Sequence, residues 1–294
     1  MPTCWGPGGF GLALGAAAAG FTRRRAFATP MTDESRLAYD PPVVRHGRGA
    51  VGSLAAEVEA AGAESALVVT GRSVGDARGV MDPVRAGLGD RLAGVFAETT
   101  GQKSLATARA AAAAMRDAGA DALVGVGGGS SLDVATVASV LAVDDRPPER
   151  VEREVRETGA LSVPEGPLPP VLTVPTTLAG AAMSTGAGLT VAGGCEQVSG
   201  HATDPRLMPA ATVYDPALVA TTPDGVLRAS AMNGFDKAVE SLYARAATPV
   251  TDATASAALG RLVDALPTLA TSERDVAGAV EGTMLAEYGV ARAD

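Results

Sequence analysis

The sequence predicts an α/β domain with a parallel sheet over residues 35–216, followed by an all-α domain over residues 217–294. Two observations predict this organisation. From Val44 onward, short apolar stretches alternate with segments of helical periodicity, as in parallel strands joined by helices of about 10–15 residues. After Pro216 only helical patterns follow. A chain of 294 residues with 47% hydrophobic residues can also bury a sizeable core, which fits two domains.

The first 34 residues differ in composition from the rest. Residues 6–20 are rich in Gly and Ala, and three arginines at positions 23–25 follow them. A secretory signal carries its positive charges before its apolar stretch, so this order does not fit one. The stretch is also short for a membrane span and is interrupted by glycines. We therefore predict a disordered extension over residues 1–34 and a cytoplasmic protein, with an unusual membrane anchor as the alternative.

Apolar runs bounded by glycine, proline or charged residues predict the strands, and Ala, Val and Leu at helical spacing predict the helices. In chain order we expect a helix over 54–61, strands over 66–70 and 92–96, a helix over 105–118, a strand over 122–126, a helix from Ser130 or Ser131 and a strand over 171–174. The stretch 144–170 breaks the periodicity with charge and proline and is expected to be a surface excursion. Because ligands of parallel sheets bind at the carboxyl ends of the strands, Gly71, Gly127 and Thr176 are expected to converge on one crevice.

The helical part begins where Thr222-Pro223-Asp224 can open a helix. Helical patterns then cover residues 226–246, 251–262 and 279–290. The last pattern stops without a C-cap glycine, so we expect a truncated helical domain with a small core and an exposed apolar patch. Such a patch would promote association, and the sequence leaves a homo-oligomer open.

The most informative stretch is 121–135, where a strand runs into Gly127, Gly128 and Gly129 and then into a helix. Glycines at this turn let the backbone approach a bound group closely. The helix that follows presents unpaired N–H groups and the positive end of its dipole, which suits a phosphate or pyrophosphate. The alternative is a tight turn in which Ser130 is an ordinary N-cap. The stretch is neither a Walker loop, because no lysine follows the glycines, nor the G-x-G-x-x-G spacing of the common dinucleotide fold.

Residues 127–135 form the motif G-G-G-S-x-x-D-x-A. This motif resembles the cofactor signature of the iron-containing alcohol dehydrogenases and their relatives, the glycerol dehydrogenases, maleylacetate reductases and dehydroquinate synthases. The family motif usually continues with Lys, whereas this chain has Thr136. Further stretches resemble the same family in the same order, namely V-P-T-T at 174–177, D-P-R at 204–206, Y-D-P at 214–216 and the helix over 232–245. The resemblance extends from about residue 44 to residue 288.

The resemblance implies an NAD or NADP cofactor. It places Gly127, Gly128, Gly129 and Ser130 at the pyrophosphate, and Asp133, Thr176 and Thr177 along the cofactor. Gly71 and Arg72 follow the strand over 66–70, where an acid favours NAD and an Arg accommodates the 2′-phosphate of NADP. NADP is therefore slightly favoured, with a solvated Arg72 at a loop tip as the alternative. Apolar residues at 178–182 replace the small polar and acidic residues of relatives, which implies a more apolar pocket.

The helix that carries the metal site in the family departs most from the pattern. Its first two metal positions are Asn233 and Lys237 here, four residues apart, so that both side chains face one way. Asn is a poor ligand for a transition metal and a protonated Lys cannot ligate at all, so we predict no metal site. Asp236 and Glu240 are the alternative pair. The Lys237 ammonium, with Asn233, could instead face the reacting oxygen in place of the metal, or form a surface ion pair with Glu240.

The net charge of −9 argues against nucleic acid as a partner. Cys4 and Cys195 are too few for a disulfide framework or a Cys-based zinc site. We predict a metal-independent, NAD(P)-dependent oxidoreductase that interconverts a small alcohol and a carbonyl by hydride transfer. A non-catalytic nucleotide-binding remnant is the main alternative. A lyase of the dehydroquinate synthase type is less favoured, because neither a zinc site nor basic residues that grip a phosphate are apparent.

Overall fold

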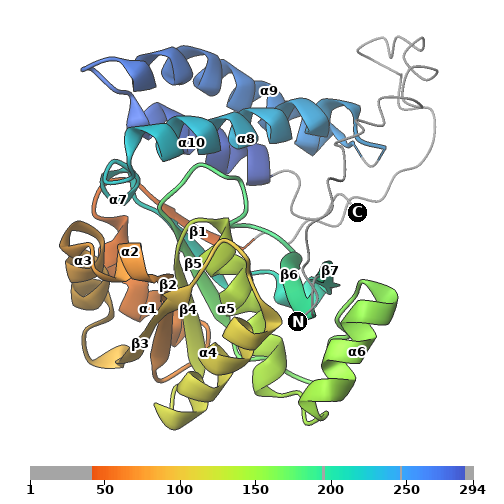
Figure 1. Cartoon of the computed structure of the whole chain (residues 1–294). Coiled ribbons are helices and arrows are strands. Elements are labelled where there is room, and N and C mark those ends of the chain that lie inside the picture. Colours follow the sequence, from red (N-terminus) through yellow and green to blue (C-terminus); the bar gives the residue numbers. More distant parts are fainter. Residues whose placement is uncertain (1–41, 194–195, 246, 289–294) are drawn as a thin grey trace, which may run out of the picture. The chain divides into compact units, whose positions relative to one another are not determined.

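The computed structural model describes residues 42–193, 196–245 and 247–288, which all belong to one compact unit, Asp40–Asp294. The extension predicted over residues 1–34 lies outside the described residues. The larger sheet has six strands in the order β1-β8-β5-β4-β2-β3, and all neighbours are parallel (Figure 1). These strands are β1 (Val43–His46), β2 (Ala66–Gly71), β3 (Leu92–Thr99), β4 (Ala122–Gly127), β5 (Val171–Pro175) and β8 (Ala211–Tyr214). The predicted parallel sheet is confirmed.

Helices cover both faces of this sheet. Successive side chains of a strand point to opposite faces, and in the central strands the side chains on both faces are apolar and buried. The helices of this part are η1 (Ala50–Ser53), α1 (Leu54–Ala60), α2 (Arg72–Gly75), α3 (Arg78–Leu88), η2 (Gly89–Arg91), α4 (Leu105–Asp117), α5 (Gly129–Ala142), α6 (Pro148–Thr158), η3 (Pro205–Leu207) and α7 (Pro216–Val219). In β2, Leu67 and Val69 pack with α4 and α5 in one core cluster. Val68 packs in the opposite cluster with α1 and α3.

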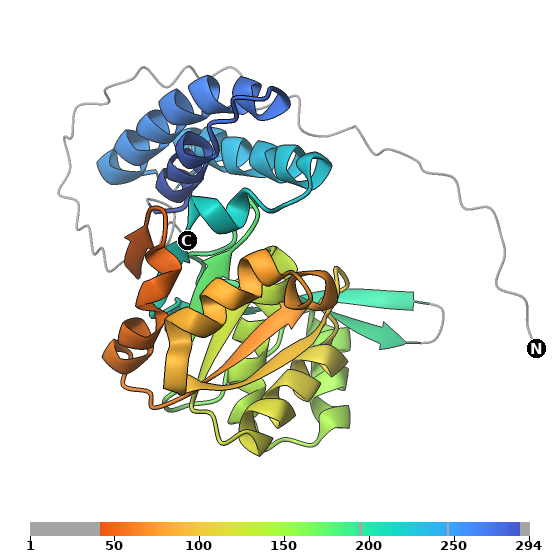
Figure 2. The ribbon, with the colours of Figure 1, turned by 90° about the vertical axis from the view of Figure 1, so that its left-hand side faces the viewer.

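The helical part consists of α8 (Asp224–Tyr243), α9 (Pro249–Ala265), η4 (Leu266–Ala270) and α10 (Val276–Tyr288). The predicted all-helical segment after the sheet is confirmed, and α8 begins directly after Pro223 as expected. Its core includes Leu178 and Tyr214 from the strand ends together with Leu227 of α8 and Val280 of α10. The helices therefore pack over the carboxyl ends of the strands (Figure 2). Among the described helices, none combines the length and the apolar character needed to span a membrane.

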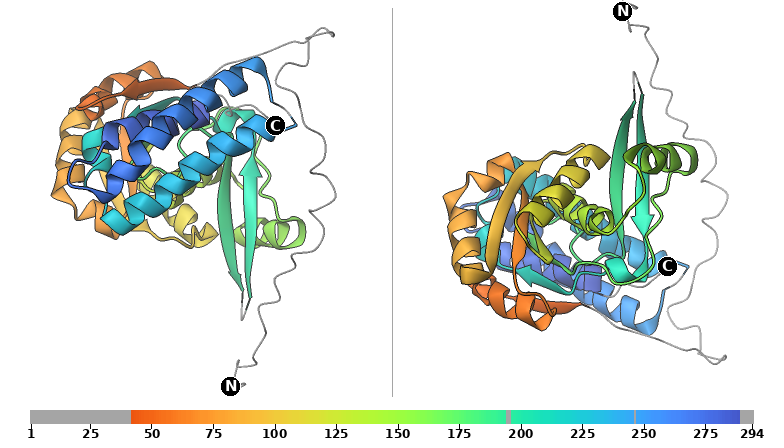
Figure 3. Two further views of the ribbon diagram at one scale, coloured as in Figure 1. Left: turned by 90° about the horizontal axis from the view of Figure 1, so that it is seen from above. Right: turned by 90° about the horizontal axis from the view of Figure 1, so that it is seen from below.

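A separate antiparallel hairpin, β6 (Gly186–Gly193) and β7 (Glu196–Thr203), lies beside α5 and extends away from the sheet (Figure 3). The sequence analysis did not expect it. Ala187, Leu189 and Val191 alternate along β6 and are buried in the same cluster as α5. Gly188 and Thr190, which lie between these residues, are small, so the alternation in hydropathy along β6 is weak and does not mark the strand in the sequence.

The stretch 144–170 is not wholly irregular, because it contains α6. Pro147 and Pro148 occupy the N-cap and the first helical position, which suits proline. Val151 and Val155 lie four residues apart on one buried face, and Arg153 between them is exposed. Part of the proline and charge content that suggested a surface excursion therefore belongs to an amphipathic helix.

Candidate functional site

Three strand ends that the sequence places at one crevice are neighbours in the sheet. β2, β4 and β5 lie side by side, so Gly71, Gly127 and Thr176 come to the same edge (Figure 1). The Thr176 N–H donates to the carbonyl of Gly127 over 2.9 Å. This hydrogen bond joins the turn after β5 to the turn after β4.

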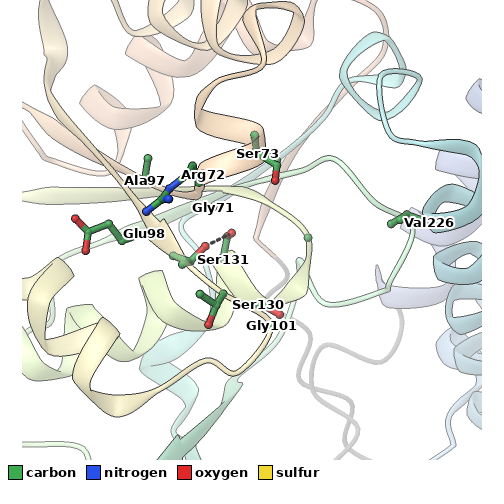
Figure 4. Close-up of a pocket in the computed structure, with 13 residues that line it drawn as sticks. Gly71, Arg72, Ser73, Ala97, Glu98, Gly101, Ser130, Ser131 and Val226 are labelled. Atoms are coloured by element: carbon green, nitrogen blue, oxygen red, sulfur yellow. Dashed lines mark hydrogen bonds between the residues drawn. The ribbon is translucent and has the colours of Figure 1, made fainter.

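A cavity of about 860 Å³ opens at this edge, at the ends of β2 and β3 and the start of α5 (Figure 4). Small-molecule sites commonly have volumes of about 300–1,000 Å³. Among the residues expected to bind the cofactor, those that line it are Gly71, Arg72, Gly128 and Ser130. The other residues that line it are Ser73, Val74, Ala97, Glu98, Thr99, Thr100, Gly101, Ser131 and Val226.

The end of β3 contributes to this cavity, which was not expected from the sequence. The sequence predicts an end of that strand at residue 96, whereas β3 continues to Thr99. The rule applied to β2 and β4, that residues at a carboxyl strand end face the ligand, would have selected Glu98 and Thr99 as well. Val226 comes from the first turn of α8 and no local pattern predicts it, because its place depends on how the helices pack on the sheet.

Hydroxyl groups form one wall of the cavity. Thr99 Oγ1 and Ser131 Oγ share a hydrogen bond of 2.7 Å, which Figure 4 draws as a dashed line. Among the described side chains, Thr70 Oγ1 is buried without a hydrogen-bond partner at the end of β2. A Cβ built on Gly127 would lie 3.9 Å from it. A buried hydroxyl that lacks a partner indicates that this edge of the sheet is shaped for a further polar group.

The triple glycine forms the turn between β4 and α5. Gly127 has a φ of +138°, a conformation that favours glycine. Gly128 is the N-cap and the helix begins at Gly129, so the expected start at Ser130 or Ser131 is slightly too late. The interpretation of Ser130 as the N-cap is likewise wrong. The Ser131 N–H donates to the Gly128 carbonyl, but no side chain caps the helix, so the N–H groups of Gly129 and Ser130 are left for another acceptor, which an anionic ligand would suit.

The loop 178–184, which follows β5, crosses the start of α5. A Cβ on Gly129 would lie 3.2 Å from Ala181 Cβ, and a Cβ on Gly128 would lie 3.4 Å from Thr177 Cγ2. Thr177 is partly exposed beside the turn, whereas Thr176 is buried. The close approach of this loop leaves little space for a side chain at Gly129, whereas a Cβ on Gly128 would be in ordinary contact with Thr177.

One face of α8 packs on the same loop. Ser230 Oγ accepts a hydrogen bond of 3.1 Å from the N–H of Leu178. One turn later, a Cβ on Gly234 would lie 3.2 Å from the Leu178 carbonyl oxygen. Lys237 comes next on this face, and its Cδ would lie 2.7 Å from a Cβ on Gly180, which has a φ of +67°. The structure therefore places Lys237 over the loop that crosses the glycine turn.

Glu287 of α10 is a buried acid beneath this region. Its carboxylate accepts hydrogen bonds from the N–H groups of Ala182 (2.6 Å) and Met183 (2.9 Å) and from the Tyr214 hydroxyl (2.6 Å). Burial raises the pKa of Glu287, while these hydrogen bonds and the positive charge of Lys237 act in the opposite direction. Burial, followed by the nearby carboxylate, raises the pKa of Tyr214 well above its ordinary value. Glu287 thus joins the last described helix to the loop and to the end of β8.

Asp133, expected along the cofactor, forms an ion pair instead of lining the cavity. Lys103 Nζ lies 2.7 Å from Asp133 Oδ2, and the backbone of Gly188 also hydrogen-bonds the carboxylate. Burial raises the pKa of Asp133, and the Lys103 ammonium opposes this rise. Among the described non-glycine residues only Lys103 has a positive φ, +51°. That conformation costs about 1–2 kcal/mol. The sequence analysis did not single out Lys103.

The two positions that the family resemblance assigns to a metal do not fit a metal ion here. Asn233 is exposed on α8, while Lys237 lies over Gly180 and presents an ammonium, which cannot ligate. The alternative pair, Asp236 and Glu240, is exposed. Within the described residues, His, Cys, Asp and Glu nowhere form a group of three or more that could hold a metal. This donor set does not suit iron or zinc.

An open parallel sheet with helices on both faces, a glycine turn at its carboxyl edge and a helical part over that edge define an α/β protein with a ligand crevice at the strand ends. The comparison with protein families specifies this class further. The model of the iron-containing alcohol dehydrogenases matches residues 41–216, and the chain belongs to this family of oxidoreductases.

Individual relatives agree with this membership. Maleylacetate reductase 1 of Cupriavidus pinatubonensis is 29% identical over 240 residues, which are 81% of this chain and 58% of the reductase. The NAD-dependent methanol dehydrogenase of Bacillus methanolicus is 29% identical over 254 residues, which are 85% of this chain and 64% of that enzyme. A solved 1,3-propanediol oxidoreductase has the same fold, with a TM-score of 0.78 at 23% identity over 88% of this chain and 67% of its own. The chain spans about three fifths of the length of the two relatives.

Proposed function

We propose that the protein is an NAD(P)-dependent oxidoreductase that interconverts an alcohol and a carbonyl by hydride transfer without a metal ion. The observation that carries this proposal is the cavity beside the uncapped N-terminus of α5, at the carboxyl ends of β2, β3 and β4. Its glycines and its hydroxyl groups suit a dinucleotide, and one relative is named as NAD-dependent. The division into a cofactor domain over 35–216 and a catalytic helical domain over 217–294 is part of this proposal.

Different residues of the crevice contact successive parts of the dinucleotide in this proposal. The pyrophosphate is bound by Gly127, Gly128, Gly129 and Ser130, because the start of α5 offers N–H groups and the positive end of a dipole. Thr176 and Thr177, at the turn after β5, line the remainder of the cofactor, whereas Asp133 is held by Lys103 and is assigned no direct contact with it. At the adenosine end, Gly71 permits close approach, Arg72 accommodates a 2′-phosphate and so slightly favours NADP, and the exposed side chain of Val226 covers the base. When bound, the nicotinamide ring supplies or accepts the hydride.

Lys237 is proposed to stabilise negative charge on the reacting oxygen, with Asn233 one turn before it on α8. Its position over the loop that crosses the glycine turn supports this role. So does the buried Glu287, whose hydrogen bonds hold that loop and whose charge attracts the Lys237 ammonium. Because the donors on α8 do not fit a metal, no step is assigned to one.

The test begins with binding and ends with turnover. The purified full chain is titrated with NADH and with NADPH while nicotinamide fluorescence is followed, and aldehydes and ketones are then screened in EDTA. We expect saturable binding and carbonyl-dependent oxidation of the reduced cofactor that chelation does not abolish. Absence of binding would refute the proposal. Binding without turnover of any carbonyl would instead support a non-catalytic nucleotide-binding protein, which the altered metal positions Asn233 and Lys237 also favour.

A further inference from the structure

We infer that Glu98 is a second determinant of cofactor choice and that it opposes the 2′-phosphate that Arg72 accommodates. This inference rests on the proposed dinucleotide site. Both residues line the same cavity, and Figure 4 shows their side chains at one rim. The sequence analysis weighed Arg72 alone, because it follows the strand whose end meets the adenosine ribose.

The strand register explains why the two charges lie together. β2 and β3 are adjacent and parallel, and Gly71 pairs with Thr99. Arg72 directly follows one member of this pair and Glu98 directly precedes the other. The Thr99 side chain turns toward α5, where it bonds Ser131, so the Glu98 side chain turns to the other side of β3 and is exposed at the rim of the cavity. A Cβ on Gly71 would lie 3.2 Å from the Thr99 carbonyl oxygen, so the two strand ends are in close contact.

The effect of the Glu98 carboxylate on cofactor affinity depends on whether the adenosine ribose carries a 2′-phosphate. An unmodified ribose offers two hydroxyl groups, and a carboxylate accepts hydrogen bonds from them, which favours NAD. A 2′-phosphate carries a charge of about −1.5 to −2 at neutral pH, and a carboxylate at the same rim repels it. Arg72 attracts the same phosphate. With both groups present, the two effects offset each other, and the preference for NADP is weaker than Arg72 alone would give.

The experiment measures binding rather than turnover. Dissociation constants of the full chain for NADH and NADPH are determined by fluorescence, and those for AMP and adenosine 2′,5′-bisphosphate by calorimetry. The members of each pair differ only by the 2′-phosphate, and the second pair lacks the nicotinamide half. The variants are Glu98→Gln, Arg72→Gln and the double substitution. Glu149→Gln is the matched control, because Glu149 is exposed on α6 and does not line the cavity.

Glu98→Gln is expected to shift the affinity ratio toward the 2′-phosphorylated ligand by about three- to tenfold, the scale of one surface charge acting on a phosphate a few ångströms away. Arg72→Gln is expected to shift the ratio the other way. Both shifts should shrink in about 0.5 M salt, because exposed charges are screened. Glu149→Gln should leave the ratio unchanged.

The outcomes separate this inference from the proposed function. If the wild-type chain binds none of the four ligands, the dinucleotide site itself is refuted, and the inference falls with it. If the chain binds them and Glu98→Gln leaves the ratio within twofold of the wild type, or shifts it no more than Glu149→Gln does, the role of Glu98 alone is refuted. A shift that persists undiminished in high salt would also contradict a Coulombic origin.

Discussion

Substitutions at Gly129 test the glycine turn most directly. A Cβ at this position would lie 3.2 Å from Ala181 Cβ, whereas two carbon atoms in favourable contact are about 3.5–4.0 Å apart. Gly129→Ala therefore requires the loop 178–184 to move away by a few tenths of an ångström. Gly129→Val adds two methyl groups with restricted χ1 freedom in a helix, so the loop must move further and the turn proposed to bind the pyrophosphate is displaced with it.

The expected loss of affinity follows from the hydrogen bonds at the start of α5. Displacing the pyrophosphate from one charge-assisted N–H bond costs about 1.5–3 kcal/mol. Since each 1.4 kcal/mol is about tenfold in Kd, Gly129→Val should raise the dissociation constants for NADH and NADPH by roughly 10- to 100-fold. Gly129→Ala, which places only one carbon against Ala181, should lose less than tenfold.

The assay is a fluorescence titration of each folded variant, with circular dichroism and thermal unfolding measured on the same samples. Gly260→Val is the matched control, because Gly260 lies within α9 and a Cβ there would meet nothing within 4 Å. It makes the same change in helix propensity without touching the crevice. A folded Gly129→Val variant that binds NADH as tightly as the wild type would refute the assignment of the glycine turn to the cofactor.

Further predictions concern the charged groups around the crevice. Lys237→Ala should lower turnover by roughly 10²-fold or more while dinucleotide affinity stays within a few-fold, and a loss below threefold would argue against an electrostatic role. Activity should survive exhaustive chelation, and tightly bound iron or zinc that leaves together with the activity would overturn metal independence. Glu287→Ala should lower the free energy of unfolding, measured in urea, by about 3–5 kcal/mol, because two N–H groups and the Tyr214 hydroxyl lose their acceptor. Glu287→Gln should lower it less, because the amide keeps an oxygen for the N–H groups. The folded-state pKa of Glu287 is raised, so its contribution to stability is complete below its ordinary pKa of 4.5 and is lost as the pH rises through the raised value. The stability of the wild type relative to Glu287→Gln should therefore fall from about pH 4 toward neutrality, and a pH-independent difference would contradict the raised pKa.

The sheet could be predicted from the sequence because its central strands are continuous apolar runs. β2, β4 and β5 are buried on both faces, and each run ends in a glycine or proline that marks the strand end. The parallel order of the strands then follows from the helices between them. Local patterns also placed the glycine turn correctly at the carboxyl edge, since the strand, the glycines and the helix are consecutive in sequence.

The rest of the site depends on contacts between segments that are far apart in sequence. Val226 reaches the cavity because α8 packs on the loop after β5, and nothing within its own helix indicates this. Asp133 pairs with Lys103, thirty residues earlier, so its position in the motif gave no sign of its partner. The hairpin was overlooked because its small residues give a weak alternation in hydropathy, and its burial comes from α5 rather than from its own pattern.

The hydrogen bonds of Glu287 also bear on the order in which the protein is assembled during synthesis. Glu287 is 105 residues after Ala182 and 73 residues after Tyr214. At about 5–20 residues per second, a ribosome needs roughly 5–20 s to add the 105 residues between Ala182 and its acceptor. During that interval the N–H groups of the loop can bond only to water, so the sheet can form while the loop over the glycine turn stays hydrated. The crevice therefore reaches its final form only after α10 has been synthesised, and a ribosome-stalled chain that ends before α10 should have a folded sheet without a finished cofactor site.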